Sequence, residues 1–161
     1  MKKIDLYVIL KTINRVKSIK NAKFAYFLAK NKKIILDEIT IIEEAKEKYE
    51  KDIQETLTEY NKEKDIIINK VSVKDKDGNV LDIERGKFFI ENNKMEEYKT
   101  EIEKLDNEYC GMLEKKKEID EINNKLLEEN IKLKGTQRIN ISDLPDISLE
   151  EIEPLMEFID E

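Results

Sequence analysis

The chain has 161 residues, 42% charged and 39% hydrophobic, with a formal net charge of −7 at pH 7. This length and composition predict one domain that can bury an apolar core. The absence of His and the presence of a single Cys, Cys110, exclude histidine-based catalytic triads, histidine-ligated zinc sites and an internal disulfide. No apolar run approaches the ~18 residues of a transmembrane helix, so we expect a cytoplasmic protein with no membrane partner.

Helical spacing dominates the first part of the chain. Behind Asp5, a potential N-cap, apolar residues recur at three- and four-residue steps, which predicts a basic N-terminal helix within 1–20. Residues 22–69 contain no Gly or Pro and repeat the same steps, which predicts one long helix. Its apolar positions are Phe24, Phe27, Leu28, Ile35, Ile39, Ile42, Tyr49, Ile53, Leu57 and Tyr60.

The motif DKDGN follows this helix. Asp75 and Asp77 ahead of Gly78 resemble the start of a calcium loop. However, Val80 and Gly86 occupy the positions where such a loop needs its Gly and its bidentate Glu. The motif is therefore predicted to be a turn, and no metal site is expected.

Residues 70–91 are accordingly predicted to form a β-hairpin with 75–78 as its turn. The predicted strand pairing joins Val71 and Val73 to Val80 and Ile83. Next, Phe88, Phe89 and Ile90 are consecutive, so one face of a strand cannot bury all three. They either plug the open end of the helices, which is the favoured interpretation, or form an exposed contact patch.

A second long helix is predicted over 93–133. Its apolar positions follow the 3.5-residue repeat of coiled coils: Met95, Tyr98, Ile102, Leu105, Tyr109 and Met112. Two long helices joined by a short segment most simply fold back antiparallel. A turn centred near residue 81 then places Tyr60 near Ile102 and Ile53 near Tyr109.

The last segment, 138–161, is predicted to hold a strand-like stretch and a C-terminal helix. Ser148 and Glu151 form a capping box, and Pro154 predicts a kink or a restart. We thus expect a mainly α, single-domain protein over 1–161. It consists of a long antiparallel helical hairpin, a coiled coil, with a small β-hairpin at its tip and short terminal helices packed at its base. A two-helix arm buries a limited core, so a homo-oligomer, most simply a dimer, is expected.

Charge is unevenly distributed along the chain. Residues 1–33 carry ten Lys or Arg against Asp5, giving +9, and the remainder carries twenty against thirty-six, giving −16. The basic end either pairs with acidic residues of the protein itself, which is favoured, or binds an anionic nucleotide or nucleic acid. The candidate residues for a partner or anion are Arg15, Lys20, Lys23, Tyr26, Lys30 and Lys33. Tyr26 lies off the apolar stripe and is free to stack.

No catalytic residue and no cofactor is predicted. Acidic runs at helical spacing resemble di-metal bundles, but those bundles also need inward-facing His. Cys110 adjoins a seam residue and has no base beside it, so a half-buried, inert thiol is expected.

Three phrases, KFAYFLAKNKK, KDKDGNV and INISDLPDISLEEIEPLMEFI, together resemble a family of small uncharacterised phage and prophage proteins of low-GC Gram-positive bacteria. The resemblance implies a phage protein made in the bacterial cytoplasm, and it transfers no catalytic residue. Pro154 departs from the unbroken final helix expected in that family.

The sequence therefore predicts a non-enzymatic, phage-encoded protein that acts by protein–protein interaction. The first hypothesis is modulation or inhibition of a host factor, for example a defence system. The alternatives are an accessory or structural role in phage assembly, and binding of an anionic nucleotide or nucleic acid through the basic end.

Overall fold

The computed structural model describes residues 1–84 and 87–160. Within them the fold is mainly helical with small β-pairs, which confirms the predicted fold class at this level. Gly86, which enters the calcium-loop comparison, lies outside the described residues, as do Arg85 and Glu161.

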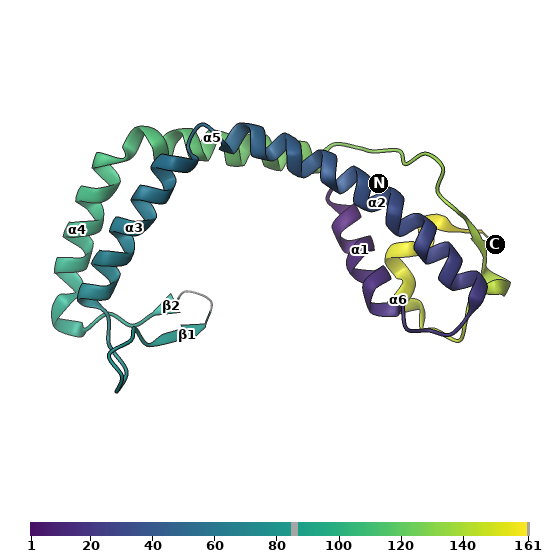
Figure 1. Ribbon diagram of the computed structural model, residues 1–161, viewed down its shortest axis with the longest axis horizontal. Helices are drawn as coiled ribbons and strands as arrows, with labels where there is room; N and C mark the ends of the chain where they lie inside the picture. The colour runs from purple at the N-terminus through teal and green to yellow at the C-terminus, as the bar shows by residue number, and fades with distance from the viewer. Residues whose placement is uncertain (85–86, 161) are drawn as a thin grey trace. The chain divides into compact units, whose positions relative to one another are not determined.

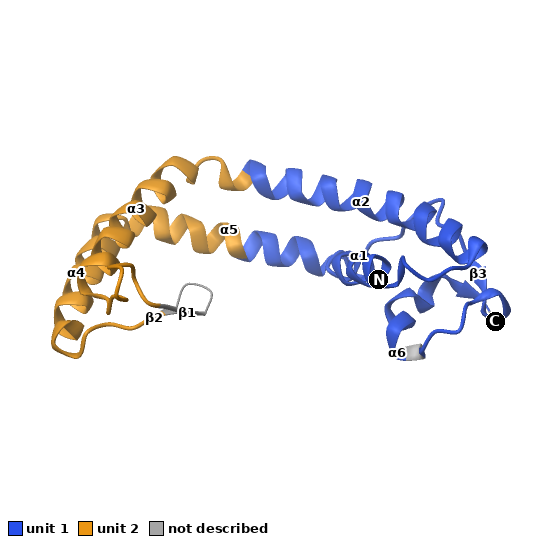
Figure 2. Cartoon of the chain, turned by 60° about the horizontal axis from the view of Figure 1, so that its bottom comes forward, with its two compact units in different colours: residues 1–48, 121–161 blue, residues 49–120 orange. Residues whose placement is uncertain are grey.

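Two compact units divide the chain (Figure 2). Unit 1 comprises residues 1–48 and 121–161, and unit 2 comprises residues 49–120. In the described part of the chain, no helix is both long and apolar enough to cross a membrane. The elements, with η for 3-10 helices, are α1 (Asp5–Val16), α2 (Ala22–Glu50), α3 (Gln54–Val71), β1 (Asp82–Glu84), β2 (Lys87–Phe88), η1 (Asn92–Lys94), α4 (Met95–Glu108), α5 (Cys110–Glu128), β3 (Ile139–Asn140), η2 (Ile141–Asp143), α6 (Leu149–Ile152), η3 (Glu153–Phe158) and β4 (Ile159–Asp160) (Figure 1).

The helix predicted over 22–69 is two helices, because α2 ends at Glu50 and α3 starts at Gln54. Ile53, in the turn between them, is only 4% exposed and belongs to the apolar cluster of unit 2. The turn keeps local hydrogen bonds, since the Ile53 amide donates to the Glu50 carbonyl (3.0 Å) and the Leu57 amide to the Ile53 carbonyl (2.8 Å). Burial of the Ile53 side chain offsets the loss of backbone hydrogen bonds between α2 and α3. The sequence has neither Gly nor Pro at this break.

Tyr109 divides the second long helix, predicted over 93–133, into α4 and α5. Its backbone leaves helical geometry (φ −99°, ψ 16°), and its ring packs edge-on against Tyr60 with 5.6 Å between centroids. After this break Met112 takes the buried position and Cys110 is exposed. The prediction of a half-buried thiol is therefore wrong.

α5 ends at Glu128, short of the predicted helix end. Beyond it, the N-terminal residues supply new backbone partners. The Lys3 amide donates to the Glu129 carbonyl (2.9 Å), and the Ile131 amide donates to the Met1 carbonyl (3.0 Å). Pairing with the opposite end of the chain thus replaces the next turn of the helix.

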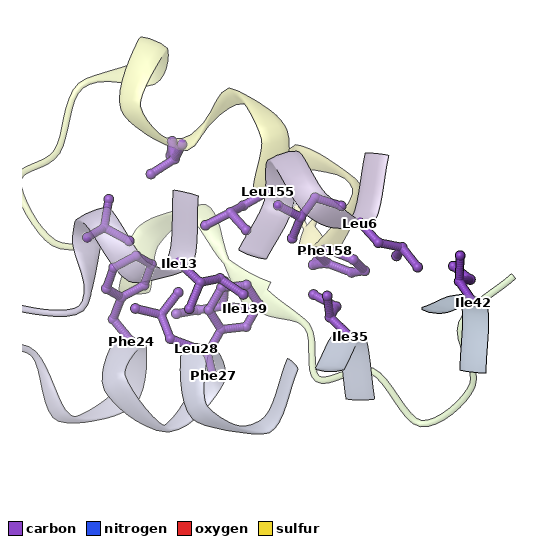
Figure 3. Packing of buried hydrophobic residues seen from close by; sticks show 13 residues of the cluster. Leu6, Ile13, Phe24, Phe27, Leu28, Ile35, Ile42, Ile139, Leu155 and Phe158 are labelled. Carbon is purple, nitrogen blue, oxygen red and sulfur yellow. The ribbon is translucent and has the colours of Figure 1, made fainter. Parts of the chain in front are cut away.

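Unit 1 is built around an apolar core to which α1, α2 and the C-terminal segment contribute (Figure 3). Its buried members are Leu6, Ile9, Ile13, Val16, Phe24, Phe27, Leu28, Ile35, Ile42, Ile139, Ile152, Leu155 and Phe158. The rings of Phe24 and Phe27 are stacked, with centroids 5.9 Å apart. The predicted apolar stripes of α1 and of residues 24–42 are the faces that this core buries, whereas Tyr49, predicted on the same stripe, is 47% exposed.

Asn31 attaches the C-terminal segment to α2. It is fully buried, and its side-chain amide donates to the Gln137 carbonyl (2.9 Å) while its side-chain oxygen accepts from the Gln137 amide (2.8 Å). One side chain thereby satisfies both backbone groups of a residue next to β3. β3 in turn pairs in parallel with β4, Ile139 opposite Ile159.

Two predicted features of the C-terminal segment are confirmed. The Ser148 hydroxyl oxygen accepts a hydrogen bond from the Glu151 amide (3.3 Å), and the Ser148 amide donates to a Glu151 carboxylate oxygen (3.3 Å), as a capping box requires. α6 ends at Ile152, and a 3-10 helix begins with Pro154 in its first turn. This is the restart expected because Pro cannot continue an α-helix.

In unit 2, α3 and α4 lie antiparallel. The Tyr60 hydroxyl donates to the Asp106 carboxylate (2.8 Å), and Lys70 Nζ lies 2.7 Å from Glu97. The predicted register, with Tyr60 opposite Ile102, is therefore displaced by about one helical turn. The buried side chains of this unit's apolar cluster are Ile53, Tyr60, Leu105, Met112 and Ile119. A coiled coil over the full predicted length stays a prediction.

A small β-element connects α3 to α4. The amide of Val73 donates to the Phe89 carbonyl (2.7 Å), and its carbonyl accepts from the Leu81 amide (3.0 Å). Two hairpins branch here: one has residues 75–78 as its tip, and the other contains β1 and β2 (Figure 1). The displaced helical register follows from the helix ends, because α3 runs to Val71 and α4 begins at Met95, each two residues beyond the predicted bounds.

The strand pairing predicted for this segment is partly wrong. The Val71 carbonyl accepts from the Glu91 amide (3.0 Å), and Ile83 lies in β1, which pairs with β2. Val80 stays in the expected hairpin, opposite Lys74. Residues 89–91 pair with residues 71–73, the segment predicted to pair with Val80 and Ile83. The local sequence pattern does not distinguish between these two partners.

Candidate functional site

Four of the six candidate residues of the basic end lie on one stripe of α2, with Lys33 two turns beyond Tyr26. Lys23, Tyr26 and Lys30 are spaced by three and four positions, so they share one side of the helix. All three are exposed, because Phe24 and Phe27 of the neighbouring stripe take the buried positions. Lys30 Nζ lies 5.7 Å from the centre of the Tyr26 ring, within range of a cation–π interaction.

Lys23 and Tyr26 line a cleft of about 210 Å³ in unit 1. The opposite wall comes from the segment around β3 and η2 and includes Gln137, Arg138 and Asn140. Core residues hold both walls, since Phe27 and Ile139 line the cleft and are also buried members of the apolar core of unit 1. The cleft thus has a rigid base and a polar rim.

Each cation of the cleft already has a carboxylate partner. Lys23 Nζ lies 2.7 Å from Asp143, and Arg138 Nε lies 2.5 Å from Asp160. The Lys23 and Arg138 side chains are 72% and 53% exposed, and ion pairs of this kind contribute little to stability. A competing anion can therefore replace these carboxylates at low cost.

Three further candidate residues, Arg15, Lys20 and Lys33, do not line this cleft. Arg15 donates a hydrogen bond to the Glu151 carbonyl (2.8 Å) and so connects α1 to α6. Lys20 and Lys33 are exposed. The structure thus splits the predicted basic site into one cleft-lining pair, its neighbour Lys30, and residues elsewhere.

Sequence reasoning missed the wall opposite α2. Gln137 and Arg138 lie more than 100 positions from Lys23 and Tyr26 along the chain, so no spacing rule connects the two walls. One local signal was available: Arg138 and Asn140 alternate with Ile139, which places the two polar side chains on the outer side of a strand.

Three lysines of the basic end, Lys2, Lys3 and Lys23, pair with acidic groups of the same unit. Lys2 pairs with Glu128, and Lys3 Nζ lies 2.6 Å from Glu129. The hydrogen bond with Glu128 raises the pKa of Lys2. These contacts, with the pair formed by Lys23, support the interpretation that the basic residues neutralise the chain's own carboxylates.

Sequence reasoning also missed a cluster joining α1 to α2. The Tyr7 hydroxyl donates to the Glu43 carboxylate, and Lys46 Nζ lies 3.2 Å from Glu43. Burial, together with Glu43, raises the pKa of Tyr7, whereas the Tyr7 hydrogen bond and Lys46 lower the pKa of Glu43. Both shifts favour a neutral Tyr7 and an ionised Glu43. The hydrogen bond between them is a polar clasp that joins α1 to α2.

In unit 2, the three consecutive apolar residues of the predicted patch separate. The Phe88 ring packs edge-on against Tyr98, with 6.0 Å between centroids, and Ile90 is half-buried. Phe89 points the other way and is 52% exposed. Phe88 therefore covers the first turn of α4, and Phe89 is the member left for a contact.

The Asp75 carboxylate shapes the turn of the DKDGN motif. It accepts hydrogen bonds from the amides of Asp77 and Asn79, each at 2.9 Å, and these bonds lower its pKa. Gly78 supplies the positive φ of 83° that this turn needs. Among the described residues, no group of three or more Cys, Asp or Glu side chains could hold a metal ion.

Comparisons with protein-family models, curated proteins and solved structures found no match for this chain. The residues themselves therefore carry the functional argument. Two features of the described residues point to a binding function: the cleft of unit 1 and the exposed Phe89 of unit 2.

Proposed function

We propose that this chain is a non-enzymatic binding protein of phage or prophage origin. It acts in the bacterial cytoplasm by contacting a host protein, whose activity it modulates or inhibits. The observation that carries this proposal is the exposure of Phe89 on a backbone that is already fixed.

Phe89 has the features of an interface anchor. Its carbonyl is hydrogen-bonded to the Val73 amide, and its neighbours Phe88 and Ile90 are packed or half-buried. Little conformational entropy remains to be lost when such a ring is covered. Leu81, 40% exposed, bonds to the same Val73 and adds apolar area beside the branch. Aromatic anchors of this kind contribute a large share of the binding energy at protein interfaces.

Affinity capture from host lysate tests the proposal, with the tagged full chain and with or without nuclease. We expect a host protein to be retained by the wild type and by the control Ile66→Ser, whose side chain in α3 is 68% exposed. Retention by Phe89→Ser is expected to fall about tenfold or more, the range of aromatic interface anchors. Equal retention by both variants contradicts the proposed contact.

Other outcomes select the alternatives. Recovery of the chain alone, as large homo-oligomers or together with phage particles, favours a role in assembly. Loss of all retained material on nuclease treatment favours a nucleic-acid ligand. Turnover of a substrate that persists through exhaustive purification overturns the non-enzymatic assignment.

A further inference from the structure

We propose that the cleft of unit 1 binds a nucleotide, with the base on Tyr26 and the phosphate between Lys23 and Arg138. This site lies in a different unit from Phe89 and takes a different class of ligand. The nucleotide site can therefore be tested independently of the proposed protein contact at Phe89.

Tyr26 provides the surface for the base. Its ring is 57% exposed, although the neighbouring Phe24 and Phe27 are buried. Tyr26 lines the cleft and Lys30 does not, so a base entering the cleft meets the ring without displacing the Lys30 ammonium. Stacking of a base on an exposed aromatic ring is a recurrent mode of nucleotide recognition that any base can use.

Lys23 and Arg138 provide the charge for the phosphate. They approach the cleft from opposite walls, one from the first turn of α2 and one from the residue before β3. α2 has no acidic residue in its first turn, so the positive end of its dipole adds to the Lys23 charge. A phosphate can accept two parallel hydrogen bonds from the Arg138 guanidinium. It would replace the Asp160 carboxylate, whose ion pair with Arg138 is exposed to solvent.

Polar groups in the cleft can read the edge of the base. Gln137 and Asn140 carry side-chain amides, and the Asp143 carboxylate becomes available as an acceptor once Lys23 turns to the phosphate. Asn31 holds the Gln137 backbone through two hydrogen bonds, so this wall is preorganised. The volume of about 210 Å³ is below the range of roughly 300–1,000 Å³ of drug-sized ligand pockets, which suits one nucleotide unit rather than two.

Direct binding to the purified full chain at low salt tests the site. The probes are a set of nucleoside monophosphates, a labelled mixed-sequence single-stranded oligonucleotide, and inorganic phosphate. We expect the monophosphates or the oligonucleotide to bind more tightly than inorganic phosphate. Binding of monophosphates identifies a free nucleotide as the ligand, and binding of the oligonucleotide alone identifies a strand.

Three variants and a control locate the site. Tyr26→Leu is expected to weaken binding about fivefold to a hundredfold, the effect of removing a stacking ring. Lys23→Ala and Arg138→Ala are each expected to weaken it about tenfold, as for a charge-assisted hydrogen bond to phosphate. Lys33→Ala removes the same charge from the same helix outside the cleft and is expected to change binding less than about twofold.

Two results overturn the proposal: no binding of any nucleotide or oligonucleotide by the wild type, or equal weakening by Lys33→Ala and the cleft variants. The second result would indicate nonspecific attraction to the basic end. Because all four side chains are exposed, circular dichroism is expected to show a wild-type fold for each variant, which keeps the comparison valid. In the oligonucleotide arm, Lys23→Ala is also expected to lower the slope of log affinity against log salt by about 0.7, whereas Tyr26→Leu leaves it unchanged.

Discussion

The buried side chains of unit 1 come from both ends of the chain, with α1 and α2 packed against β3, α6 and η3. Those of unit 2 come from the turn after α2 and from α3, α4 and α5, and its cluster of buried residues is smaller. Both units also have polar clasps, meaning hydrogen bonds from a Tyr hydroxyl to a carboxylate on another helix. In unit 1 the Tyr7 hydroxyl donates to Glu43. In unit 2 the Tyr60 hydroxyl donates to Asp106 and the Tyr109 hydroxyl donates to Glu63, both at 2.8 Å. Apolar burial between distant segments therefore dominates the stability of unit 1, whereas unit 2 has a smaller apolar cluster drawn from segments closer together in sequence.

The largest expected effect comes from truncating a core ring in unit 1. Phe24→Ala is expected to cost about 3–5 kcal/mol, because Phe24 is fully buried and the cavity left behind cannot collapse completely. Denaturant unfolding measures the loss, and hydrogen exchange with mass spectrometry locates it. We expect faster exchange in α2 and in the C-terminal segment, with protection of α3 and α4 retained.

The matched variant in unit 2 is Leu105→Ala, at a position that is 5% exposed. It is expected to cost about 2–5 kcal/mol and to raise exchange in α3 and α4 first. If either variant raises hydrogen exchange equally in both units, the two units unfold together. That result contradicts separate sources of stability for unit 1 and unit 2.

A smaller effect is expected from the buried polar anchor of unit 1. Asn31→Ala leaves the Gln137 amide and carbonyl without their partner, which is expected to cost about 1–3 kcal/mol. Denaturant midpoints, together with exchange of the Gln137 amide, measure the change. Asn14→Ala is the control, since the Asn14 bond to Lys32 lies at the surface and its loss is expected to cost less than about 0.5 kcal/mol. Equal costs for both substitutions would show that the buried anchor has no special role.

The smallest effect is expected in unit 2 and depends on pH. Burial, with the hydrogen bond to Asp106, raises the pKa of Tyr60 from 10.0 to about 12. A pKa raised by folding means that the neutral hydroxyl stabilises the fold below pH 10 and that this contribution is lost as the pH rises through about 12. Tyr60→Phe is expected to cost about 0.5–1.5 kcal/mol at neutral pH.

The difference in unfolding free energy between wild type and Tyr60→Phe should therefore shrink across this alkaline range. Titration of both chains, followed by tyrosinate absorbance and circular dichroism, measures it. Lysine titration affects both chains alike and cancels in the difference. A difference that stays constant with pH would remove Tyr60 from the polar clasps assigned to unit 2.

Much of the local structure could be predicted. The buried faces of α1 and α2, the turn at Asp75, the capping box at Ser148 and the restart at Pro154 all follow local patterns. Each depends on bonds between residues a few positions apart, which the spacing of residue types encodes directly. The exposure of Tyr26 beside Lys23 and Lys30 was also predictable, since it follows from the helical repeat.

The breaks after Glu50 and at Tyr109, the displaced register and the second wall of the cleft could not be predicted in this way. In each case a local preference is outweighed by a contact with a distant segment. Ile53 leaves the helix to enter an apolar cluster, and Arg138 lines the same cleft as Tyr26 only because the core of unit 1 brings β3 to α2.

By itself the sequence determined which residues form helices and turns, which faces of α1 and α2 are buried, and that chemistry based on His is excluded. Tertiary structure alone decided where α2, α4 and α5 end and which polar groups meet, as Asn31 meets Gln137 and Lys23 meets Asp143. The physical reason is the range of the interactions. Helical and turn patterns arise from hydrogen bonds within about four positions, whereas segments far apart in sequence meet only when burial of a shared apolar core outweighs the entropy of closing the chain between them.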